Sequence, residues 1–332
     1  MNAFVIGSGS YLPEQIVTNE DLSKKLQISP EQIVKSSGIR ERRWVNKGTT
    51  TSELAGKALV SAVESSGIQL ADLDYLLFGT MTPDRFIPGC APALQNGLGL
   101  KEIPCLDIRA ACCNALYGLQ ISRALVISGA VHDLALCLAE VQSPLLEISP
   151  RAATTSMLFG DAAAALIISA SPRKGALEIV DVHLATDGQY VDDLGIRCPG
   201  SEYGEGEESQ DREPRMVGQS VILQASRKMV GACKEILERN DLEVNDVRWI
   251  VPHQANANLL AQVARGIGLT NCDKVISLIE RTGNTSSASM GLALDHLLRE
   301  CAVKEGDYVL LPAFAAGFTW GAALCRAVWF RE

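Results

Sequence analysis

The sequence lacks the features that mark metal-binding, nucleic-acid-binding and membrane-spanning proteins. Its ten cysteines include no CxxC pair and no Cys/His spacing suited to zinc, so we expect no metal site and a reducing compartment. Basic residues cluster only in "RERR" at 40–43 and the net charge is −9, which argues against nucleic acid or a membrane surface as partner. Apolar runs such as "GDAAAALIISA" fall short of the ~20 residues of a membrane span, and the N-terminus lacks a signal-peptide pattern. These absences favour a cytoplasmic enzyme or binding protein.

Short apolar runs alternate with longer segments of helical period, which is typical of an α/β protein. The clearest strand candidates are "AFVIGSG", "YLLFGTM", "ALIISA", "RWIVPH" and "YVLLPAF". Residues 51–67 predict a helix with Thr51 or Ser52 as its N-cap, Glu53 in its first turn and Gly67 just beyond its end.

A weak internal repeat relates two distant regions. Residues 65–80, "SSGIQLADLDYLLFGT", match residues 239–254, "RNDLEVNDVRWIVPHQ", and each contains a helix end, an Asp and then a strand. The parallel continues in "GLGL" at 97–100 and "GIGL" at 266–269. We therefore expect two similar halves, residues 1–172 and 173–332, each a sheet layered with helices.

The segment 198–216, "CPGSEYGEGEESQDREPRM", has no apolar period and is rich in Gly, Glu and Ser. This composition predicts an exposed, mobile loop, either a solvated insertion or a lid over a site entrance.

Only four histidines are present, and one of them stands out. His132, His183 and His296 lie in helix or strand patterns without polar company, which favours structural roles. His253 follows an apolar strand and a proline in "WIVPHQANAN", and polar residues surround it. The end of a buried strand is where α/β proteins place active-site groups, so His253 is a candidate.

Two more segments could contribute to a site. In "RTGNTSSASMGLAL" (281–294), Asn284 lies at a turn, where it could act chemically or merely cap the next helix. In "FAAGFTWGAAL" (314–324), Ala315, Ala316 and Gly317 are small enough for backbone N–H groups to approach a ligand.

The adjacent Cys112 and Cys113, in "LDIRAACCNALYGLQ", fall between a strand and a helix N-terminus. A helix N-terminus stabilises a thiolate, so the position predicts a lowered thiol pKa. Position alone does not choose between the two cysteines, and a cysteine there can also be a packing residue.

Several of these segments together resemble β-ketoacyl-acyl carrier protein synthase III, the initiating ketosynthase of the thiolase superfamily. The similar segments are "GSGSYLPEQIVTNEDL", "SSGIRERR", "DIRAAC", "LFGDAAAALI", "VPHQAN", "GNTSSAS" and "FAAGFTWGAAL", and they run nearly end to end in the expected order. The resemblance implies a thiolase fold, with two duplicated βαβαβαββ-type halves in a layered αβαβα architecture.

The resemblance also implies a catalytic triad of Cys112, His253 and Asn284, with Cys113 as a packing residue. Cys112 would take an acyl group from an acyl thioester, and the backbone N–H groups of Cys112 and Ala316 would form an oxyanion hole. A malonyl thioester would then lose CO₂ and attack the acyl group to give a β-ketoacyl product. The thioesters would be carried by coenzyme A, the more favoured acyl donor, or by an acyl carrier protein. No tightly bound cofactor is implied, and the family implies a homodimer.

The sequence departs from the family pattern around the substrate. "AAG" replaces the usual "GGG" at 315–317, so Ala315 and Ala316 must avoid positive φ or accept strain. Gln32 replaces a tryptophan that stacks on the coenzyme A adenine, and Ser36 replaces a nearby arginine.

Further departures affect the carrier protein and the acyl group. Asn258 replaces an arginine that meets the carrier protein, which leaves Arg265 as the single basic residue of this helix and weakens the expected docking face. Ile87 replaces a phenylalanine that reaches the acyl pocket of the dimer mate. The candidate substrate-pocket residues are Ile87, Phe314, Gln32, Asn256 and Asn258.

These departures leave more than one function open. The first is a ketosynthase III-like condensing enzyme. The second is a specialised enzyme of secondary metabolism that transfers a non-acetyl acyl group. The third is a non-catalytic partner subunit, which the complete triad disfavours.

Overall fold

The computed structural model describes residues 2–202, 214–269 and 272–328. Within these ranges, no helix combines the length and the apolar character that crossing a membrane requires. Residues 203–213, most of the loop predicted at 198–216, lie outside the described residues. The end of that loop is not irregular, because β10 (Arg215–Met216) pairs with β9 (Leu194–Gly195).

A nine-stranded sheet runs through the molecule in the order β11-β12-β13-β8-β1-β7-β6-β4-β5. The strands from the first half of the chain are β1 (Phe4–Tyr11), β4 (Tyr75–Gly79), β5 (Cys105–Ile108), β6 (Asp133–Glu140) and β7 (Ala162–Ser169). Those from the second half are β8 (Ala176–Thr186), β11 (Val247–Ile250), β12 (Tyr308–Ala315) and β13 (Thr319–Val328). Among the described residues, the two groups of strands join where Phe4 and Val5 of β1 pair with β8.

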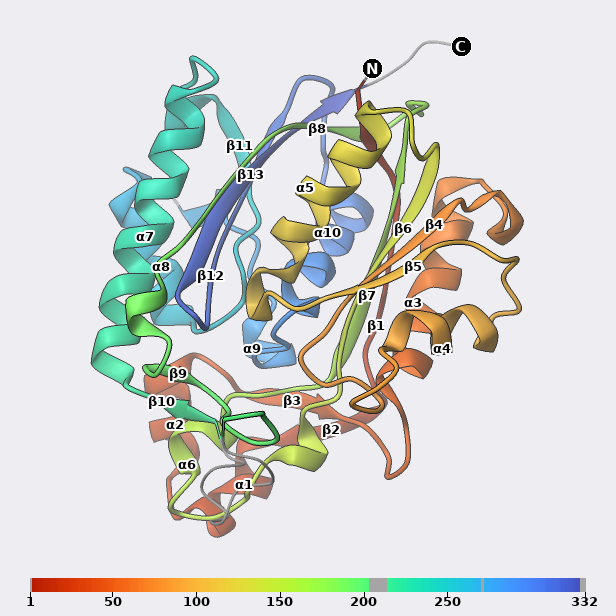
Figure 1. Ribbon diagram of the computed structural model, residues 1–332. Coiled ribbons are helices and arrows are strands. Elements are labelled where there is room, and N and C mark those ends of the chain that lie inside the picture. Colours follow the sequence, from red (N-terminus) through yellow and green to blue (C-terminus); the bar gives the residue numbers. More distant parts are fainter. Residues whose placement is uncertain (1, 203–213, 270–271, 329–332) are drawn as a thin grey trace.

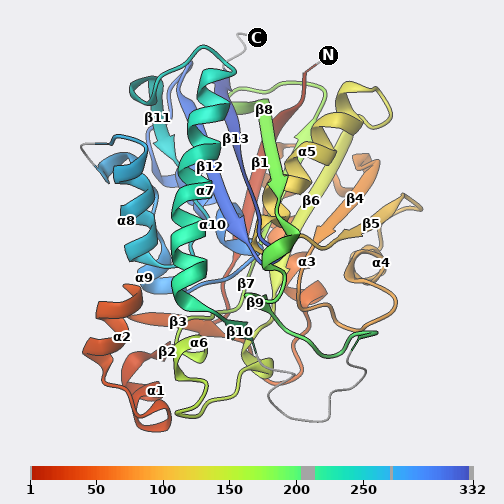
Figure 2. The same cartoon turned by 60° about the vertical axis from the view of Figure 1, so that its left-hand side comes forward.

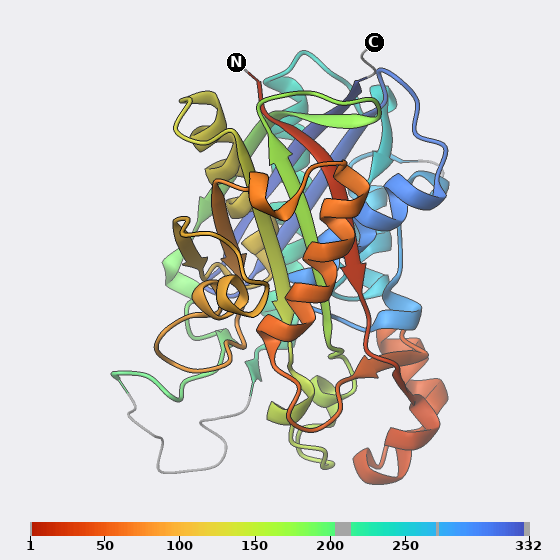
Figure 3. The same ribbon diagram turned by 90° about the vertical axis from the view of Figure 1, so that its right-hand side faces the viewer.

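Helices cover both faces of each group of strands, which produces the αβαβα layering of a thiolase fold (Figure 1). The outer helices on the first group are α3 (Thr51–Ser66) and α4 (Cys90–Gly97), and those on the second are α7 (Gly218–Glu238) and α8 (Ala257–Gly266). Between the two groups lie α5 (Asn114–Ile127) and α10 (Ala288–Glu300). Figure 2 brings α7 and α8 forward, and Figure 3 shows α3 lying across β1 and its neighbours.

The core follows these layers. The largest buried cluster joins α5 and α10 to the inward residues of both groups of strands, such as Leu136 and Leu311. A second cluster packs α3 and α4 on the opposite face of the first group, and a third packs α7 on the second group. Because side chains alternate along a strand, Val5 and Phe4 of β1 enter different clusters.

The strand predictions are confirmed, since all the runs named above form strands or parts of strands. The helix predicted over 51–67 is also confirmed, with Gly67 at φ +71° beyond its end. Its N-cap is Thr50 rather than Thr51 or Ser52. The Thr50 hydroxyl accepts from the Glu53 N–H, and the Glu53 carboxylate accepts from the Thr50 N–H in a capping box.

The internal repeat appears as matching local geometry. In each half a helix ends, a short 3₁₀ turn follows, and its Asp side chain accepts from the backbone N–H three residues earlier, at 2.8 Å for both Asp72 and Asp246. A strand comes next, β4 or β11, with a parallel neighbour. The segment after "GIGL" is reduced to a single bridge between Val275 and Ile250, where its counterpart is strand β5. The division at 172/173 stays a prediction.

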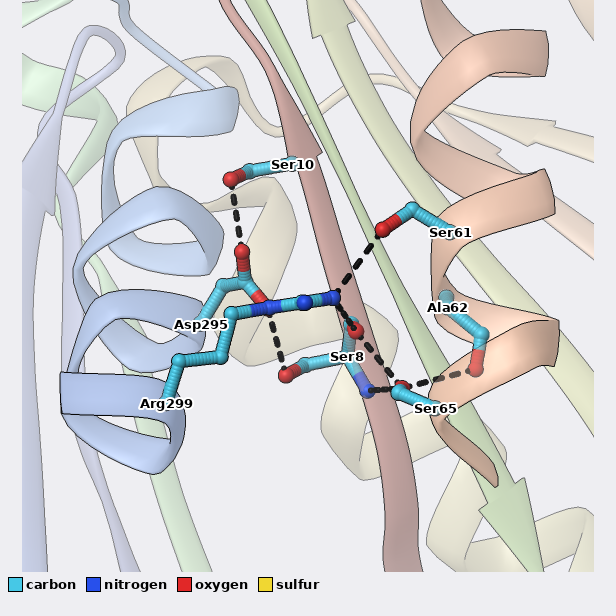
Figure 4. Close-up of polar contacts among 7 residues, drawn as sticks. All are labelled: Ser8, Ser10, Ser61, Ala62, Ser65, Asp295 and Arg299. Atoms are coloured by element: carbon cyan, nitrogen blue, oxygen red, sulfur yellow. Dashed lines mark hydrogen bonds and ion pairs between the residues drawn. The ribbon is translucent and has the colours of Figure 1, made fainter. Parts of the chain in front are cut away.

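A buried carboxylate ties the central helix α10 to the outer helix α3 around the open side of β1 (Figure 4). Asp295 is 4% exposed and accepts from the hydroxyls of Ser8 and Ser10 and from Arg299. Arg299 continues across β1 to the hydroxyl of Ser61 on α3. β8 pairs with β1 at Phe4 and Val5, so among the described residues the later part of β1 has no neighbouring strand on this edge. The Arg299 side chain can therefore cross β1 there.

Smaller elements close one end of the layers. They are β2 (Gln15–Thr18), α1 (Asn19–Leu26), α2 (Pro30–Ser37), β3 (Glu41–Trp44), α6 (Ala153–Ser156) and α9 (Ile279–Thr282). Arg42 of β3 is buried at 0% exposure and donates to backbone carbonyls of Val17 and Met157. It thereby supports the segment 157–160, whose backbone forms hydrogen bonds with the backbone of Asn284.

Candidate active site

The first part of the site is the turn that joins β5 to α5. A short 3₁₀ helix, η2 (Ala111–Cys113), fills this turn, and Ala111 has a left-handed backbone with φ +50°. Such a conformation costs a non-glycine residue ~1–2 kcal/mol, so the surroundings must hold it. The Ala110 N–H donates to the Asn114 side-chain oxygen at 2.6 Å, and this hydrogen bond closes the turn.

The structure separates the two adjacent cysteines. Cys113 is 0% exposed, and its Sγ lies 3.4 Å from the Thr319 carbonyl inside the core. Cys112 is half-buried, and its Sγ lies 3.5 Å from the hydroxyl of Ser286. Only Cys112 therefore faces the rest of the site.

The predicted lowering of the Cys112 pKa is wrong. Burial raises the pKa of this thiol to about 11, and the nearby charge of Glu140 adds to the rise, while the Ser286 hydroxyl lowers it. Cys112 is the middle residue of the 3₁₀ turn η2 rather than a residue of α5, and apolar cover and a carboxylate dominate around its sulfur. Cys112 is thus a neutral thiol at pH 7.

This thiol pKa predicts how Cys112 reacts with iodoacetamide. Because only the thiolate reacts, the rate should rise ~10-fold per pH unit from pH 7 to 10 without a plateau. Cys105 and Cys301 are also half-buried, so the rate is taken as the difference between the unmodified protein and Cys112→Ala, followed by intact mass. A plateau near pH 7 would show a thiolate that the surroundings stabilise.

The second part of the site is the turn 283–287, which leads into α10. The Asn284 backbone is held by the Leu158 carbonyl, the Gly160 N–H and the Gln142 side chain. Its side-chain oxygen accepts from the Ser286 N–H at 2.9 Å, which leaves Nδ2 as the donor end of the amide. Asn284 makes this local turn rather than capping α10, whose N-cap position is Ser287.

The third part is His253, which follows β11 and is 3% exposed. Its N–H donates to the Pro312 carbonyl of β12 at 3.0 Å, and Nδ1 lies 2.6 Å from the Ser289 hydroxyl. That hydroxyl accepts from the Gln254 N–H, so its proton is assigned to Nδ1, and the ring proton to Nε2. Burial lowers the pKa of His253 to about 4, so the imidazole is neutral at pH 7.

The fourth part is the turn between β12 and β13. Of its small residues only Gly317 has positive φ, at +91°, so Ala315 and Ala316 adopt this turn without left-handed strain. Ala316 and Cys112 pack against the same core cluster, and η2 contacts both β12 and β13. The Cys112 turn, the Asn284 turn, His253 and this hairpin therefore converge on one place.

The predicted pocket residues are more scattered. Ile87 is 77% exposed on the segment after β4, whereas Phe314 is 5% exposed and packs on Phe318 with ring centroids 4.8 Å apart. Gln32 is engaged in the capping box of α2 with Ser29. The roles of these residues in a pocket stay predictions.

Two further pocket candidates have structural contacts. Asn256 caps α8 by accepting from the Asn258 N–H, and both side chains donate to the Ser36 carbonyl at the end of α2. They thereby join α8 to α2, and their role in a pocket also stays a prediction.

Several polar groups of the site could not be recognised from the sequence. Ser286 contacts Cys112, and Ser289 contacts His253. Glu140 is another, and its charge at the end of the apolar run "LALCLAE" is the one signal in the sequence.

The prediction that His132 and His183 have no polar neighbours is wrong. His132 contacts Asp133 and Ser171, and His183 lies 3.1 Å from the Glu235 carboxylate, so both have polar company.

Comparison with known proteins now identifies the family. The model for 3-oxoacyl-[acyl-carrier-protein] synthase III matches residues 106–188, and the model for its C-terminal part matches residues 237–327. The chain is 38% identical to β-ketoacyl-[acyl-carrier-protein] synthase III of Alkalilimnicola ehrlichii over 98% of this chain and 99% of that protein.

Solved structures agree with this match. The 3-oxoacyl-[acyl-carrier-protein] synthase III of Aquifex aeolicus superimposes with a TM-score of 0.89 at 31% identity, covering 98% of this chain and 99% of that one. The priming β-ketosynthase of the R1128 polyketide pathway gives 0.88 at 30% identity, covering 98% and 96%. The chain therefore belongs to the β-ketoacyl-[acyl-carrier-protein] synthase III family and is a condensing enzyme of the acyltransferase class.

Proposed function

We propose that Cys112 is the nucleophile that accepts the acyl group in this condensing enzyme. The observation that carries the proposal is the convergence of the half-buried Cys112 thiol, His253 and Asn284 on residues 284–289. The sulfur attacks the carbonyl of an acyl thioester, the new C–S bond forms, and the bond to the donor sulfur breaks. The Cys112 proton leaves with the donor thiol, which balances the step.

We place the tetrahedral oxyanion of this step against the backbone N–H groups of Cys112 and Ala316. Small side chains at Ala315 and Ala316 and the left-handed Gly317 support this assignment, because they let backbone donors approach the substrate.

The second half of the reaction uses His253 and Asn284. A malonyl thioester loses CO₂, and the electron pair of the broken C–C bond moves toward its thioester oxygen. The Nε2–H of neutral His253 and the Nδ2–H of Asn284 donate to that oxygen as charge develops. The carbanion carbon then attacks the acyl carbonyl, the C–Sγ bond breaks, and the released Cys112 thiolate takes a proton from water.

We place the enzyme in the cytoplasm as a homodimer that uses thioesters of coenzyme A or of a carrier protein, with no bound cofactor. The dimer is supported by Phe86 and Ile87, adjacent apolar side chains that are 72% and 77% exposed.

The specialised enzyme with a non-acetyl substrate remains the second candidate. Asn258 supports it. It stands where an arginine is expected to meet the carrier protein, and its uncharged amide donates to the carbonyls of Lys35 and Ser36 on α2.

Intact-protein mass spectrometry with acyl-coenzyme A thioesters of increasing chain length tests the proposal. One acyl mass should add to the unmodified protein and to Cys113→Ala, but not to Cys112→Ala. The chain length that loads fastest names the substrate class. Acylation of Cys112→Ala would refute the assignment, and if no coenzyme A thioester loads the unmodified protein, carrier-protein thioesters are tested next.

A further inference from the structure

A buried carboxylate lies next to the nucleophile turn and takes no part in the steps described above. Glu140 is the last residue of β6 and is 0% exposed. Its oxygens accept from the hydroxyls of Thr80, Thr82 and Ser287 and from the N–H groups of Met81 and Ser287. Backbone N–H groups can only donate, so these contacts stabilise the ionised carboxylate although burial raises its pKa.

A continuous chain of hydrogen bonds connects Glu140 to the turn that carries Cys112. The Ser287 hydroxyl donates to Glu140 and accepts from the Asn114 amide nitrogen at 2.8 Å. The oxygen of the same amide accepts from the Ala110 N–H at 2.6 Å. The Asn114 amide donates through its nitrogen to Ser287 and accepts through its oxygen from Ala110. These two hydrogen bonds fix the orientation of the amide.

Gly79 leaves the space that the Asn114 side chain occupies. A Cβ on Gly79, the last residue of β4, would lie 2.8 Å from the Asn114 Cβ, so the glycine makes room for the amide. The Ser287 hydroxyl also lies 3.3 Å from the Ala111 carbonyl. Ala111 is the strained residue directly before Cys112. Its carbonyl accepts from the Asn114 N–H, and the Ala110 carbonyl before it accepts from the Cys113 N–H at 3.1 Å, so the position of Asn114 bears directly on this turn.

We propose that Glu140 is a positioning residue, which through Ser287 and Asn114 holds the left-handed turn at Ala111 and so places the Cys112 thiol for acylation. The inference rests on the proposed role of Cys112. It adds residues that do not touch the substrate but determine where the nucleophile stands.

The charge of Glu140 gives this role a distinctive signature. The titratable groups that interact with the Cys112 thiol are Glu140 and Cys113, and His253 belongs to the same site. His253 is neutral above about pH 4, and burial keeps Cys113 a thiol because its pKa is raised far above the usual value. Of these three, Glu140 is the group whose charge raises the pKa of Cys112. Removing that charge should ease ionisation of Cys112, whereas removing a purely structural contact should not.

Three variants test the proposal, read by iodoacetamide alkylation of Cys112 against pH and by the acylation rate. Glu140→Gln should move the alkylation profile ~1 pH unit toward acid, which is a ~10-fold faster reaction at pH 8. Ser287→Ala breaks the chain of hydrogen bonds but retains the Glu140 carboxylate. The kcat of acylation should therefore fall at least ~10-fold with KM nearly unchanged, and the pH profile of Cys112 alkylation should not move.

The third variant, Asp295→Asn, is the matched control. Asp295 is also a buried carboxylate that accepts from serine hydroxyls, but it ties α10 to β1 and α3 (Figure 4). It should lower thermal stability and leave the Cys112 alkylation profile unchanged. The positioning role is overturned if each of the three variants is less stable but keeps alkylation and acylation rates within ~2-fold of the unmodified protein.

A rescue experiment keeps the inference testable if Glu140→Gln does not fold. Glycine adopts positive φ without strain, so adding Ala111→Gly to Ser287→Ala should restore part of the lost acylation rate. No recovery would contradict the idea that the chain holds the Ala111 turn. Alkylation does not depend on condensation, so these results remain distinct from a failure of the proposed nucleophile.

Discussion

A Cys112→Ala variant is expected to lose condensation by at least ~10³-fold while it still decarboxylates the malonyl thioester. The proposed mechanism assigns the covalent acyl group to the Cys112 sulfur, which this variant removes. In the proposed mechanism decarboxylation uses the donors of His253 and Asn284. His253 is oriented by Ser289 of α10 and Asn284 lies in the turn before α10, so neither depends on the Cys112 sulfur. The experiment measures the rate of β-ketoacyl product formation and the rate of CO₂ release in the same samples.

Cys113→Ala is the matched control for this experiment. Cys113 is buried and contacts the Thr319 carbonyl, so its loss should cost ~1 kcal/mol in stability through a small cavity and leave condensation within a few-fold. If Cys112→Ala condenses normally and Cys113→Ala does not, the assignment of the nucleophile is reversed.

Replacement of His253 or Asn284 by alanine should slow malonyl decarboxylation ~10²–10³-fold, as for other oxyanion-hole donors. Both groups are assigned as neutral N–H donors to the enolate oxygen, and burial keeps His253 neutral because its pKa is about 4. Formation of the acyl-enzyme should change much less, because Cys112 contacts Ser286 rather than these donors. Stopped-flow CO₂ release and intact-mass acylation separate the two steps.

His132→Ala controls for the loss of a histidine elsewhere. Its ring is paired with Asp133 and Ser171 at the surface, and both steps should proceed at normal rates in this variant. A second control, Ser289→Ala, removes the partner that orients His253, and we expect a smaller loss than in His253→Ala. Equal loss of acylation and decarboxylation in His253→Ala would argue for a structural histidine.

The pH dependence of the two steps should differ for the same reasons. Decarboxylation should stay constant from pH 8 down to ~pH 5, because His253 gains its proton only as the pH approaches about 4. Acylation should rise with pH, because the Cys112 pKa is about 11 and the thiolate is scarce at pH 7. An acid limb in decarboxylation near pH 6.5 would show that His253 titrates as an exposed histidine.

Strands, helices and the order of the motifs could be predicted from the sequence because they depend on local patterns. Apolar runs such as "YVLLPAF" specify buried strands, and Gly67 ends its helix at positive φ, where glycine is favoured. The repeat was readable because each copy contains the same turn, in which Asp72 or Asp246 accepts from the backbone. His253 could be selected because it follows a buried strand.

Other properties depend on groups that only folding brings together. The pKa of Cys112 was predicted to fall because the nearest feature in the sequence is a helix N-terminus, but the fold covers the sulfur and adds Glu140 from another strand. The choice between Cys112 and Cys113 required the direction of each side chain, which adjacent residues on a strained turn do not reveal.

The sequence by itself determined the layered α/β class and the motifs that resemble one family, because periodicity and turn chemistry act over a few neighbouring residues. Tertiary structure alone decided which cysteine faces the site, which hydroxyls contact Cys112 and His253, and that Glu140 lies beside the Cys112 turn. The physical reason is distance along the chain: Cys112 and Ser286 are 174 residues apart, and their contact exists only once the sheet and α10 are packed.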